Sequence, residues 1–348
     1  MIRPALACLI AVAALAPSAA RGADAPVATT KPATTQPAAA FPTFGAAFDL
    51  PAGWAEIPRE KAGRVGQWIS PDSKPDAIKG LIMIETGRPG AASAEQMAKA
   101  LARNFGGVVM DEPTTLGGVP ALVVRAENND DEVSPTEGIV CLRGNNAYLV
   151  MGGTVKGRSV RAEVEAIRKS WTWTAVEKPA AHLEARERPF AAFNGRATLN
   201  VPRMMHQVAA DDPDTQLDLA LFNLARNTAD FRATMTLTTL GPGESFDDAK
   251  ARFLKDLAGQ FKFSKAAPAW QDRKGGTPRV VTAVTEAERP QPADTDTLHH
   301  QWAMVSLGDD TSRAVLIHFT HEAETDEERK AYERAVEAIV ASVAPAGK

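Results

Sequence analysis

The sequence predicts an α+β protein with two tandem related domains, each an antiparallel sheet flanked by helices. Three observations lead to this prediction. A Gly-Gly-x-Pro phrase followed by a β-branched run occurs twice, at Gly117–Pro120 and at Gly275–Pro278. Runs that alternate apolar and polar residues, as strands do, stand beside runs with the spacing of amphipathic helices. The landmarks of the first half also recur in the second half in the same order.

The spacing between matching landmarks grows along the chain. Pro51, in a Leu-Pro-Ala-Gly-Trp phrase, matches Pro202 at a distance of 151 residues, and the helix start at Ser93 matches Ser245 at 152. The glycine pairs match at 158. In the closing helix, Val160, Val164, Ile167 and Trp171 match Tyr332, Val336, Ile339 and Val343, all at 172. Loops that gain residues produce such growth. A period near 150 therefore indicates duplication of a whole domain, because solenoid repeats run about 20 to 50 residues.

The first 43 residues have the composition of an export signal and a tether. Arg3 precedes a short apolar run, and small residues follow it, so residues 1–22 are predicted to be a signal peptide. The apolar run is too short to span a membrane. Residues 23–43 are rich in Ala, Thr and Pro and are expected to be a flexible linker. We expect a periplasmic or secreted protein with no transmembrane segment in the mature chain.

Residues 44–173 are predicted to form the first module. Ser93 and Gln96 have the pattern of a capping box, so a helix should begin there, and Gly106 should end it. A second helix is expected over 159–171. The predicted strands span 67–70, 78–85, 121–126, 138–143 and 147–152.

A charged stretch with two prolines, 174–189, is the predicted linker to the second module, 190–344. Apolar residues alternate with polar ones along 231–239, which predicts a strand with one buried face and one solvent-exposed face. Helices should begin at Ser245 and at Thr325. The predicted strands span 217–225, 231–239, 298–307 and 313–319.

The order of these elements resembles the PsbP-like fold, which is shared by PsbP, by DcrB-type periplasmic proteins and by LpqN-type mycobacterial lipoproteins. The resemblance involves both modules and lies in the element order, the phrase Leu50–Trp54 and the Gly-Gly-x-Pro phrase. It implies an antiparallel sheet flanked by helices and mostly non-enzymatic roles in binding or assembly. It implies no particular functional residues.

The histidines of the last hairpin are the candidate metal ligands. A hairpin that is symmetric about its turn places His300 opposite Phe319, and it brings His299 and His300 near His318 and His321. Zinc needs three or four nitrogen or sulfur ligands. However, neighbouring strand residues point to opposite faces, so at most two of the four converge on one face. The first module has no histidine between Phe44 and Trp173, so the two modules cannot share a histidine site.

The other candidate residues are expected to have structural roles. Cys141, the only cysteine after signal cleavage, lies in an apolar run and is expected to be a buried thiol. The acidic stretches 128–132 and 211–214 lack the ligand pattern of a calcium loop and are expected to be solvated loops. Trp54 and Trp173 lie beside turns or ends and could anchor a partner, although packing in the core is favoured.

The sequence has no nucleophile elbow, no zinc-protease motif and no phosphate-binding glycine loop. A net charge of −4 argues against a nucleic-acid partner, which usually needs a basic face. The favoured hypothesis is therefore an exported, non-catalytic protein that binds a protein or an envelope component, and no cofactor is indicated. A metal-binding protein, possibly a hydrolase, that uses the four histidines is one alternative. A small-molecule carrier with an apolar cavity between sheet and helix is another.

Overall fold

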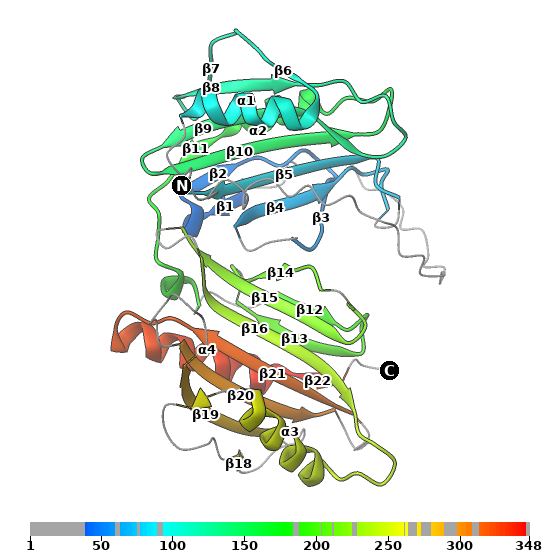
Figure 1. Cartoon of the computed structure of the whole chain (residues 1–348), viewed down its shortest axis with the longest axis vertical. Coiled ribbons are helices and arrows are strands. Elements are labelled where there is room, and N and C mark those ends of the chain that lie inside the picture. The colour runs from blue at the N-terminus through cyan, green and yellow to red at the C-terminus, as the bar shows by residue number, and fades with distance from the viewer. Residues whose placement is uncertain are drawn as a thin grey trace, which may run out of the picture. The chain divides into compact units, whose positions relative to one another are not determined.

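The computed structural model of the chain is shown in Figure 1. It describes residues 39–59, 63–74, 77–88, 93–183, 188–202, 204–210, 212–224, 228–260, 262–263, 270–272, 280–288, 298–307 and 313–345. The predicted signal peptide, most of the first linker and the second glycine phrase lie outside these residues. The chain divides into two compact units, one made of 1–57 and 63–176, the other of 58–62 and 177–348.

The first unit contains two α-helices, α1 (Ala94–Phe105) and α2 (Arg161–Ser170), among its described residues. Its strands are β1 (Ala39–Phe41), β2 (Ala46–Phe48), β3 (Ala55–Glu56), β4 (Arg64–Ile69), β5 (Gly80–Gly87), β6 (Val108–Val109), β7 (Thr114–Leu116), β8 (Val119–Arg125), β9 (Ser134–Arg143), β10 (Asn146–Thr154) and β11 (Thr172–Trp173). A 3₁₀ turn, η1 (Pro42–Phe44), joins β1 to β2.

The second unit contains α3 (Phe246–Gln260), α4 (Asp326–Ser342) and a 3₁₀ turn, η2 (Pro179–His182). Its strands are β12 (Arg188–Ala192), β13 (Ala197–Val201), β14 (His206–Val208), β15 (Gln216–Asn223), β16 (Thr228–Thr239), β17 (Lys262–Phe263), β18 (Gln271–Asp272), β19 (Val280–Glu288), β20 (Leu298–Ser306), β21 (Arg313–His321) and β22 (Ala344–Pro345).

The two units have the same strand order. The large sheet runs β3-β4-β5-β10-β9-β8-β6 in the first unit and β14-β15-β16-β21-β20-β19-β17 in the second. In each, one further strand pairs with the second-to-last strand, β7 with β8 and β18 with β19. The small sheets are β1-β2-β11 and β12-β13-β22, and the strands pair antiparallel throughout. The protein is therefore α+β, and its units are two copies of one topology.

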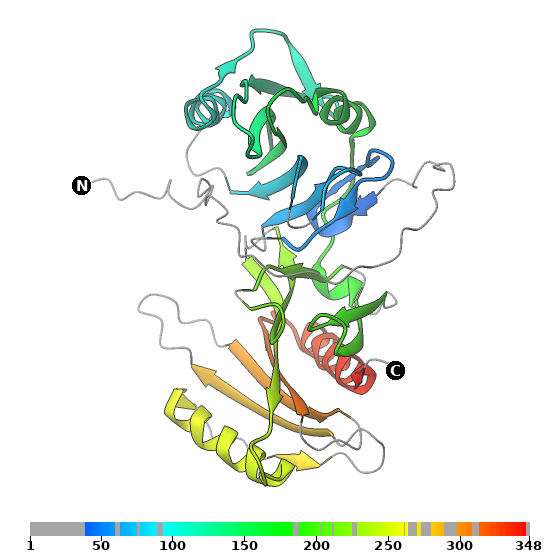
Figure 2. The same cartoon turned by 90° about the vertical axis from the view of Figure 1, so that its right-hand side faces the viewer.

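In each unit the large sheet lies between helices. Figure 2 shows α1 and α2 on opposite sides of the first unit's sheet, and α3 and α4 on opposite sides of the second unit's sheet. Leu101 and Ala102 of α1 pack on one face against Val140 and Met151. On the other face α2 packs closely against β10. Gly152 of β10 permits this approach, since a Cβ at that position would lie only 2.3 Å from a methyl group of Val160.

Aromatic side chains fill the space between the two sheets of the first unit. Phe48 stacks on Trp171 with ring centroids 5.1 Å apart, and Trp68 meets Phe48 edge to face at 6.0 Å. Tyr148 contacts both Trp171 and Trp173 and donates a hydrogen bond to the Phe44 carbonyl. Such aromatic pairs stabilise by about 0.5–1.5 kcal/mol each beyond the area they bury.

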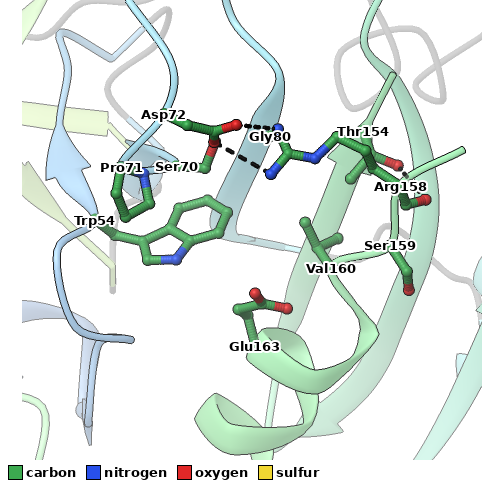
Figure 3. Close-up of a pocket in the computed structure, with 10 residues that line it drawn as sticks. All are labelled: Trp54, Ser70, Pro71, Asp72, Gly80, Thr154, Arg158, Ser159, Val160 and Glu163. Carbon is green, nitrogen blue, oxygen red and sulfur yellow. Dashed lines mark hydrogen bonds and ion pairs between the residues drawn. The ribbon is translucent and has the colours of Figure 1, made fainter. Parts of the chain in front are cut away.

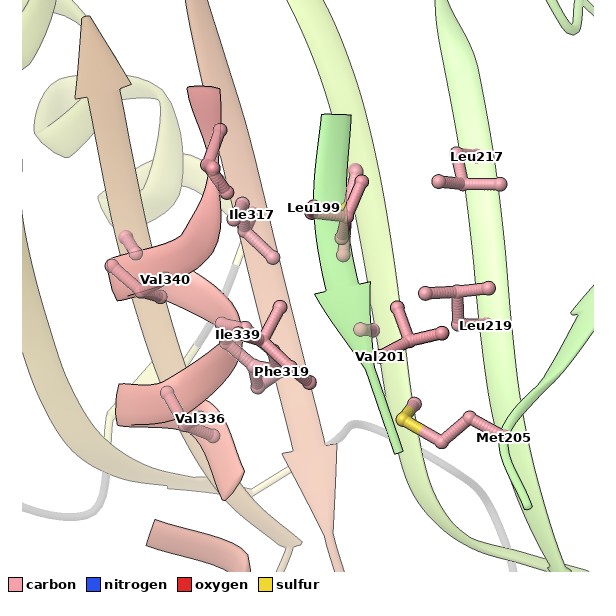
Figure 4. Packing of buried hydrophobic residues seen from close by; sticks show 14 of the residues in the cluster. Leu199, Val201, Met205, Leu217, Leu219, Ile317, Phe319, Val336, Ile339 and Val340 are labelled. Carbon is pink, nitrogen blue, oxygen red and sulfur yellow. The ribbon is translucent and has the colours of Figure 1, made fainter. Parts of the chain in front are cut away.

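Aliphatic side chains predominate at the same place in the second unit. Figure 4 shows Val336, Ile339 and Val340 of α4 facing the sheet residues Ile317 and Phe319. Leu199 and Val201 of β13 close the other side of this core. All are buried. The helix register predicted from the matching positions is thus the register that faces the core.

Several local predictions are confirmed. Ser93 accepts a hydrogen bond from the Gln96 amide at 3.2 Å and donates its own amide to the Gln96 side chain, which closes the capping box. Thr325 caps α4 by accepting from the Glu328 amide. Phe231, Ala233, Met235 and Leu237 are buried, as the alternation in β16 predicts.

The folded part of the first unit begins earlier than the sequence predicts. The expected linker, 23–43, reaches into β1 and η1, where Phe41 and Thr43 are buried. Phe41 stacks on Phe48 at 5.0 Å, so burial of this ring fixes residues whose composition alone suggests a tether.

Candidate functional site

The four predicted histidines lie together at one end of the β20–β21 ribbon. His299 pairs with His321, and His300 pairs with Thr320. The expected partner of His300 was Phe319, so the predicted register is wrong by one residue. The observed register places Phe319 opposite Gln301 and keeps it on the buried face, whereas a slip of one residue would turn the strand over.

One histidine pair faces the core beneath α4. The rings of His299 and His321 are 5.0 Å apart, and His321 also lies 5.0 Å from Tyr332. His321 is only 4% exposed. Burial, with smaller contributions from the nearby His299, Arg329 and His300 charges, lowers the pKa of His321 to about 4. His321 is therefore neutral at physiological pH.

The other pair lies on the opposite face of the ribbon. His300 Nδ1 and His318 Nε2 are 2.9 Å apart, so one nitrogen donates and the other accepts. The Trp302 ring stacks on His318 at 4.9 Å. The four histidines thus divide into two pairs, one on each face. Among the described residues, no three or more His, Cys, Asp or Glu side chains are grouped as a metal site.

The remaining sequence candidates also have definite places. Cys141 lies in β9 and is fully buried, and burial raises the pKa of its thiol to about 11. Asn128 turns back to accept the Asp130 amide and is part of an ordinary loop. Trp54 is 8% exposed, which is core-like burial, and Trp173 is half-buried and lies under the Arg143 guanidinium.

A pocket in the first unit was not predicted from the sequence. Figure 3 shows it between the loop that follows β4, the end of β10 and the first turn of α2. Its volume is about 70 Å³. It is lined by Trp54, Ser70, Pro71, Asp72, Gly80, Thr154, Arg158, Ser159, Val160 and Glu163.

An ion pair forms the rim of this pocket. The Arg158 guanidinium donates to both carboxylate oxygens of Asp72, at 2.5 and 3.1 Å. Ser70 donates its hydroxyl to the same carboxylate at 2.8 Å. The Arg158 hydrogen bond first, and then that from Ser70, lowers the pKa of Asp72 to about 2. The pair joins two loops and keeps Asp72 ionised.

The floor of the pocket is more buried than its rim. Trp54, Ser70, Thr154 and Val160 are all buried, whereas the Asp72 and Arg158 side chains are 49% and 38% exposed. Glu163 projects from the first turn of α2 on the side away from the ion pair (Figure 3). The cavity is therefore a small cup with an indole and small side chains inside and three ionisable groups around it.

Strand pairing identifies the equivalent place in the second unit. At the end of β10, Thr154 pairs with Gly80; at the end of β21, His321 pairs with Phe231. Since β10 and β21 hold the same position in the sheet order, Gly80 corresponds to Phe231 and Thr154 to His321.

The helix and the first strand agree with this correspondence. Val160 matches Tyr332 at the 172-residue spacing of the closing helices, and Trp54 matches Met205 at the 151-residue spacing of the opening phrases. Tyr332 stacks on Phe231 at 5.5 Å and contacts His321. Rings therefore fill in the second unit the space that is open in the first.

Little in the sequence indicates this pocket. Its lining residues come from four segments between Trp54 and Glu163, and none belongs to a recognised motif. The matched residues Val160 and Tyr332 differ in side-chain size, and this difference can be seen in the aligned segments. It indicates an open space in the first unit only once strand pairing shows that Gly80 corresponds to Phe231.

No protein-family model matches the sequence, and no curated protein matches it. Solved structures similar to this chain include a variant of the protein Mog1, 13% identical over 47% of this chain and 97% of that chain, with a TM-score of 0.35. The Saccharomyces cerevisiae Ran-binding protein Mog1p is 13% identical over 46% and 95%, with a TM-score of 0.34. The immunity protein TplEi of T6SS from Pseudomonas aeruginosa is 9% identical over 84% and 97%, with a TM-score of 0.27.

Proposed function

We propose that this is an exported, non-catalytic binding protein with two tandem PsbP-like units, and that the pocket of its first unit receives part of a protein partner in the envelope. The second unit acts as a supporting copy of the same scaffold. The observation behind this proposal is the contrast at one position of a duplicated fold. Gly80, Thr154 and Val160 leave a cup open in one copy, and Phe231, His321 and Tyr332 fill it in the other.

The ion pair at the rim of the pocket is suited to binding rather than to acid–base chemistry. A general acid or base works best with a pKa near the working pH. Arg158 and Ser70 hold the pKa of Asp72 at about 2, so this carboxylate does not exchange protons near neutral pH. A fixed ion pair at the rim is instead suited to orienting a polar group that enters the cup.

The size of the pocket separates this proposal from a carrier. Sites for drug-sized ligands measure roughly 300–1,000 Å³ and are mostly apolar. The present cup has about 70 Å³ and is lined by Ser70, Asp72, Thr154, Arg158 and Glu163 as well as by Trp54. It fits the end of one side chain better than an apolar cargo.

Export is the second part of the proposal. It depends on residues 1–22, which lie outside the described residues. No helix among the described residues is long and apolar enough to cross a membrane. Cell fractionation and N-terminal sequencing test this part. We expect a mature chain that begins shortly after residue 22 in the periplasmic or secreted fraction, and an intact N-terminus in the cytoplasm would contradict it.

The binding site is tested by blocking the mouth of the cup. Ser159 is exposed and lines the pocket, whereas Lys156 is exposed in the same loop and does not line it. We expect Ser159→Trp to reduce capture of the partner from the native envelope after cross-linking, and Lys156→Trp to leave capture unchanged. Equal capture by both variants would remove the pocket from the proposed function.

A further inference from the structure

We infer that the cup of the first unit binds a single primary ammonium group, the end of a lysine side chain on the partner. This inference rests on the proposed function and adds the chemistry of recognition. It follows from the charge, the aromatic lining and the size of the pocket.

The charge of the lining favours a monocation. Three ionisable side chains line the cup: Asp72, Arg158 and Glu163. Asp72 and Arg158 are joined by two hydrogen bonds and cancel each other. Glu163 has no hydrogen bond or ion pair to another of the described residues, so its negative charge is left over. An entering ammonium group would neutralise it.

The first turn of α2 does not make this an anion site. A helix N-terminus attracts negative charge. Glu163 already lies in that first turn and supplies the negative charge. The Arg161 amide is also satisfied, because it donates to the Ser159 hydroxyl at 3.2 Å. A second anion would meet Glu163, and the Arg158 charge is already neutralised by Asp72.

The apolar part of the lining favours an alkyl ammonium ion over a bare metal ion. Trp54, Pro71 and Val160 offer an indole and aliphatic groups beside Glu163 (Figure 3). A cation next to an indole is attracted by the negative face of the ring. The methylene stem of lysine packs on apolar surface while its ammonium group stays near polar groups. The volume of about 70 Å³ accommodates such an end group and little more.

A lysine side chain also fits better than an ethanolamine lipid headgroup. The headgroup carries a phosphate close to its ammonium group. That phosphate would lie at the rim, where the Arg158 charge is already neutralised by Asp72. The rim therefore offers the phosphate no unpaired cation, whereas the stem of a lysine side chain carries no charge and needs none.

The experiment is an NMR titration of the mature protein with small probes that differ in charge. The probes are n-butylammonium, n-butanol, acetate, Nα-acetyl-lysine methylamide and vesicles of phosphatidylethanolamine. The signals are the indole N–H of Trp54, assigned with Trp54→Phe, and the backbone amides of Gly80 and Ser159. We expect saturable shifts with n-butylammonium and with the lysine derivative, and none with acetate or the vesicles.

Two variants test the role of the charge. Glu163→Gln keeps the shape of the side chain and removes its charge, and it should weaken n-butylammonium binding by about tenfold. Glu333→Gln is the control, because it removes one carboxylate charge from an exposed position of α4 that does not line the cup. It should bind like the wild type. An unchanged affinity in Glu163→Gln would overturn the inference.

The wild-type titration decides the question even if Glu163→Gln fails to fold. Equal shifts with n-butanol would show apolar recognition, stronger shifts with acetate would show an anion site, and shifts with vesicles alone would show a lipid site. Each result overturns the inference. If Ser159→Trp still abolishes partner capture while n-butylammonium does not bind, the proposed function stands and only the ammonium chemistry fails.

Discussion

The Tyr332 ring of α4 lies flat against the Phe231 ring of β16, with 5.5 Å between centroids and 5° between planes. The corresponding residues of the first unit are Val160 and Gly80. One pair of aromatic rings therefore fills in the second unit the space that is an open pocket in the first. The energetic role of this pair can be tested directly.

Tyr332→Val places in the second unit the side chain that the first unit has at the same position. Tyr332 is 1% exposed and also contacts His321, so the change leaves a cavity in the core. Truncation of a large buried aromatic side chain to Ala costs about 3–5 kcal/mol of unfolding free energy, and Val restores part of the lost volume. We expect a loss near the lower end of this range in urea unfolding. The control is Glu333→Gln, which alters the exposed neighbour, and a loss below about 1 kcal/mol for Tyr332→Val would contradict tight packing there.

His321 should make the second unit sensitive to acid. Its pKa is about 4 in the folded protein and 6.5 when unperturbed. Between these values the unfolded chain binds a proton that the folded chain does not, so stability falls as pH drops from about 6.5 to 4. The full loss is about 3 kcal/mol, from about 1.4 kcal/mol for each unit of pKa.

The measurement is the unfolding free energy at neutral pH and near pH 4.5 for the wild type and for His321→Phe, which keeps a ring against Tyr332 and cannot titrate. The wild type should lose more stability on acidification than the variant. Hydrogen exchange of the β21 amides localises the effect to the second unit. Equal losses in both proteins would show that His321 is not the acid-sensitive group.

Arg158→Gln should raise the pKa of Asp72 from about 2 towards 3.8. It should remain below 3.8, because Ser70 still donates a hydrogen bond to the carboxylate. Because the folded pKa is lowered, the pair's contribution to stability is present above about pH 3.8 and is lost as pH falls through 2. A ¹³C NMR titration of the carboxyl group measures both values. An unchanged pKa in the variant would mean that Ser70 and the local backbone dominate instead.

Metal binding by the four histidines is the alternative function, and it can be tested directly. The ribbon sends two of them to each face, and zinc needs three or four ligands. We therefore expect protein purified from zinc-supplemented cultures to contain well below one zinc ion per chain. His300→Gln and His318→Gln should have the same metal content as the wild type. One zinc per chain, lost in both variants, would establish the alternative function.

Much of each unit could be predicted from short stretches of sequence. Ser93 and Gln96 close a capping box because both partners lie within one turn, and alternation along β16 identifies its buried face. The hairpin register was missed by one residue because the length of the turn does not fix it. It is fixed by the burial of Phe319 and Ile317 on the same face as Ala303.

The sequence by itself determined that the chain holds two units with one α+β scaffold, because matched phrases, helix caps and apolar spacings are local signals that recur in both halves. Only the tertiary structure decided which of the two units has an open pocket at this position. The cup brings Trp54, Gly80 and Glu163 together from separate segments, and its counterpart is filled by Phe231 and Tyr332. Whether such a space stays open depends on side-chain volumes that meet across the fold, and the spacing of residues along the chain does not encode them.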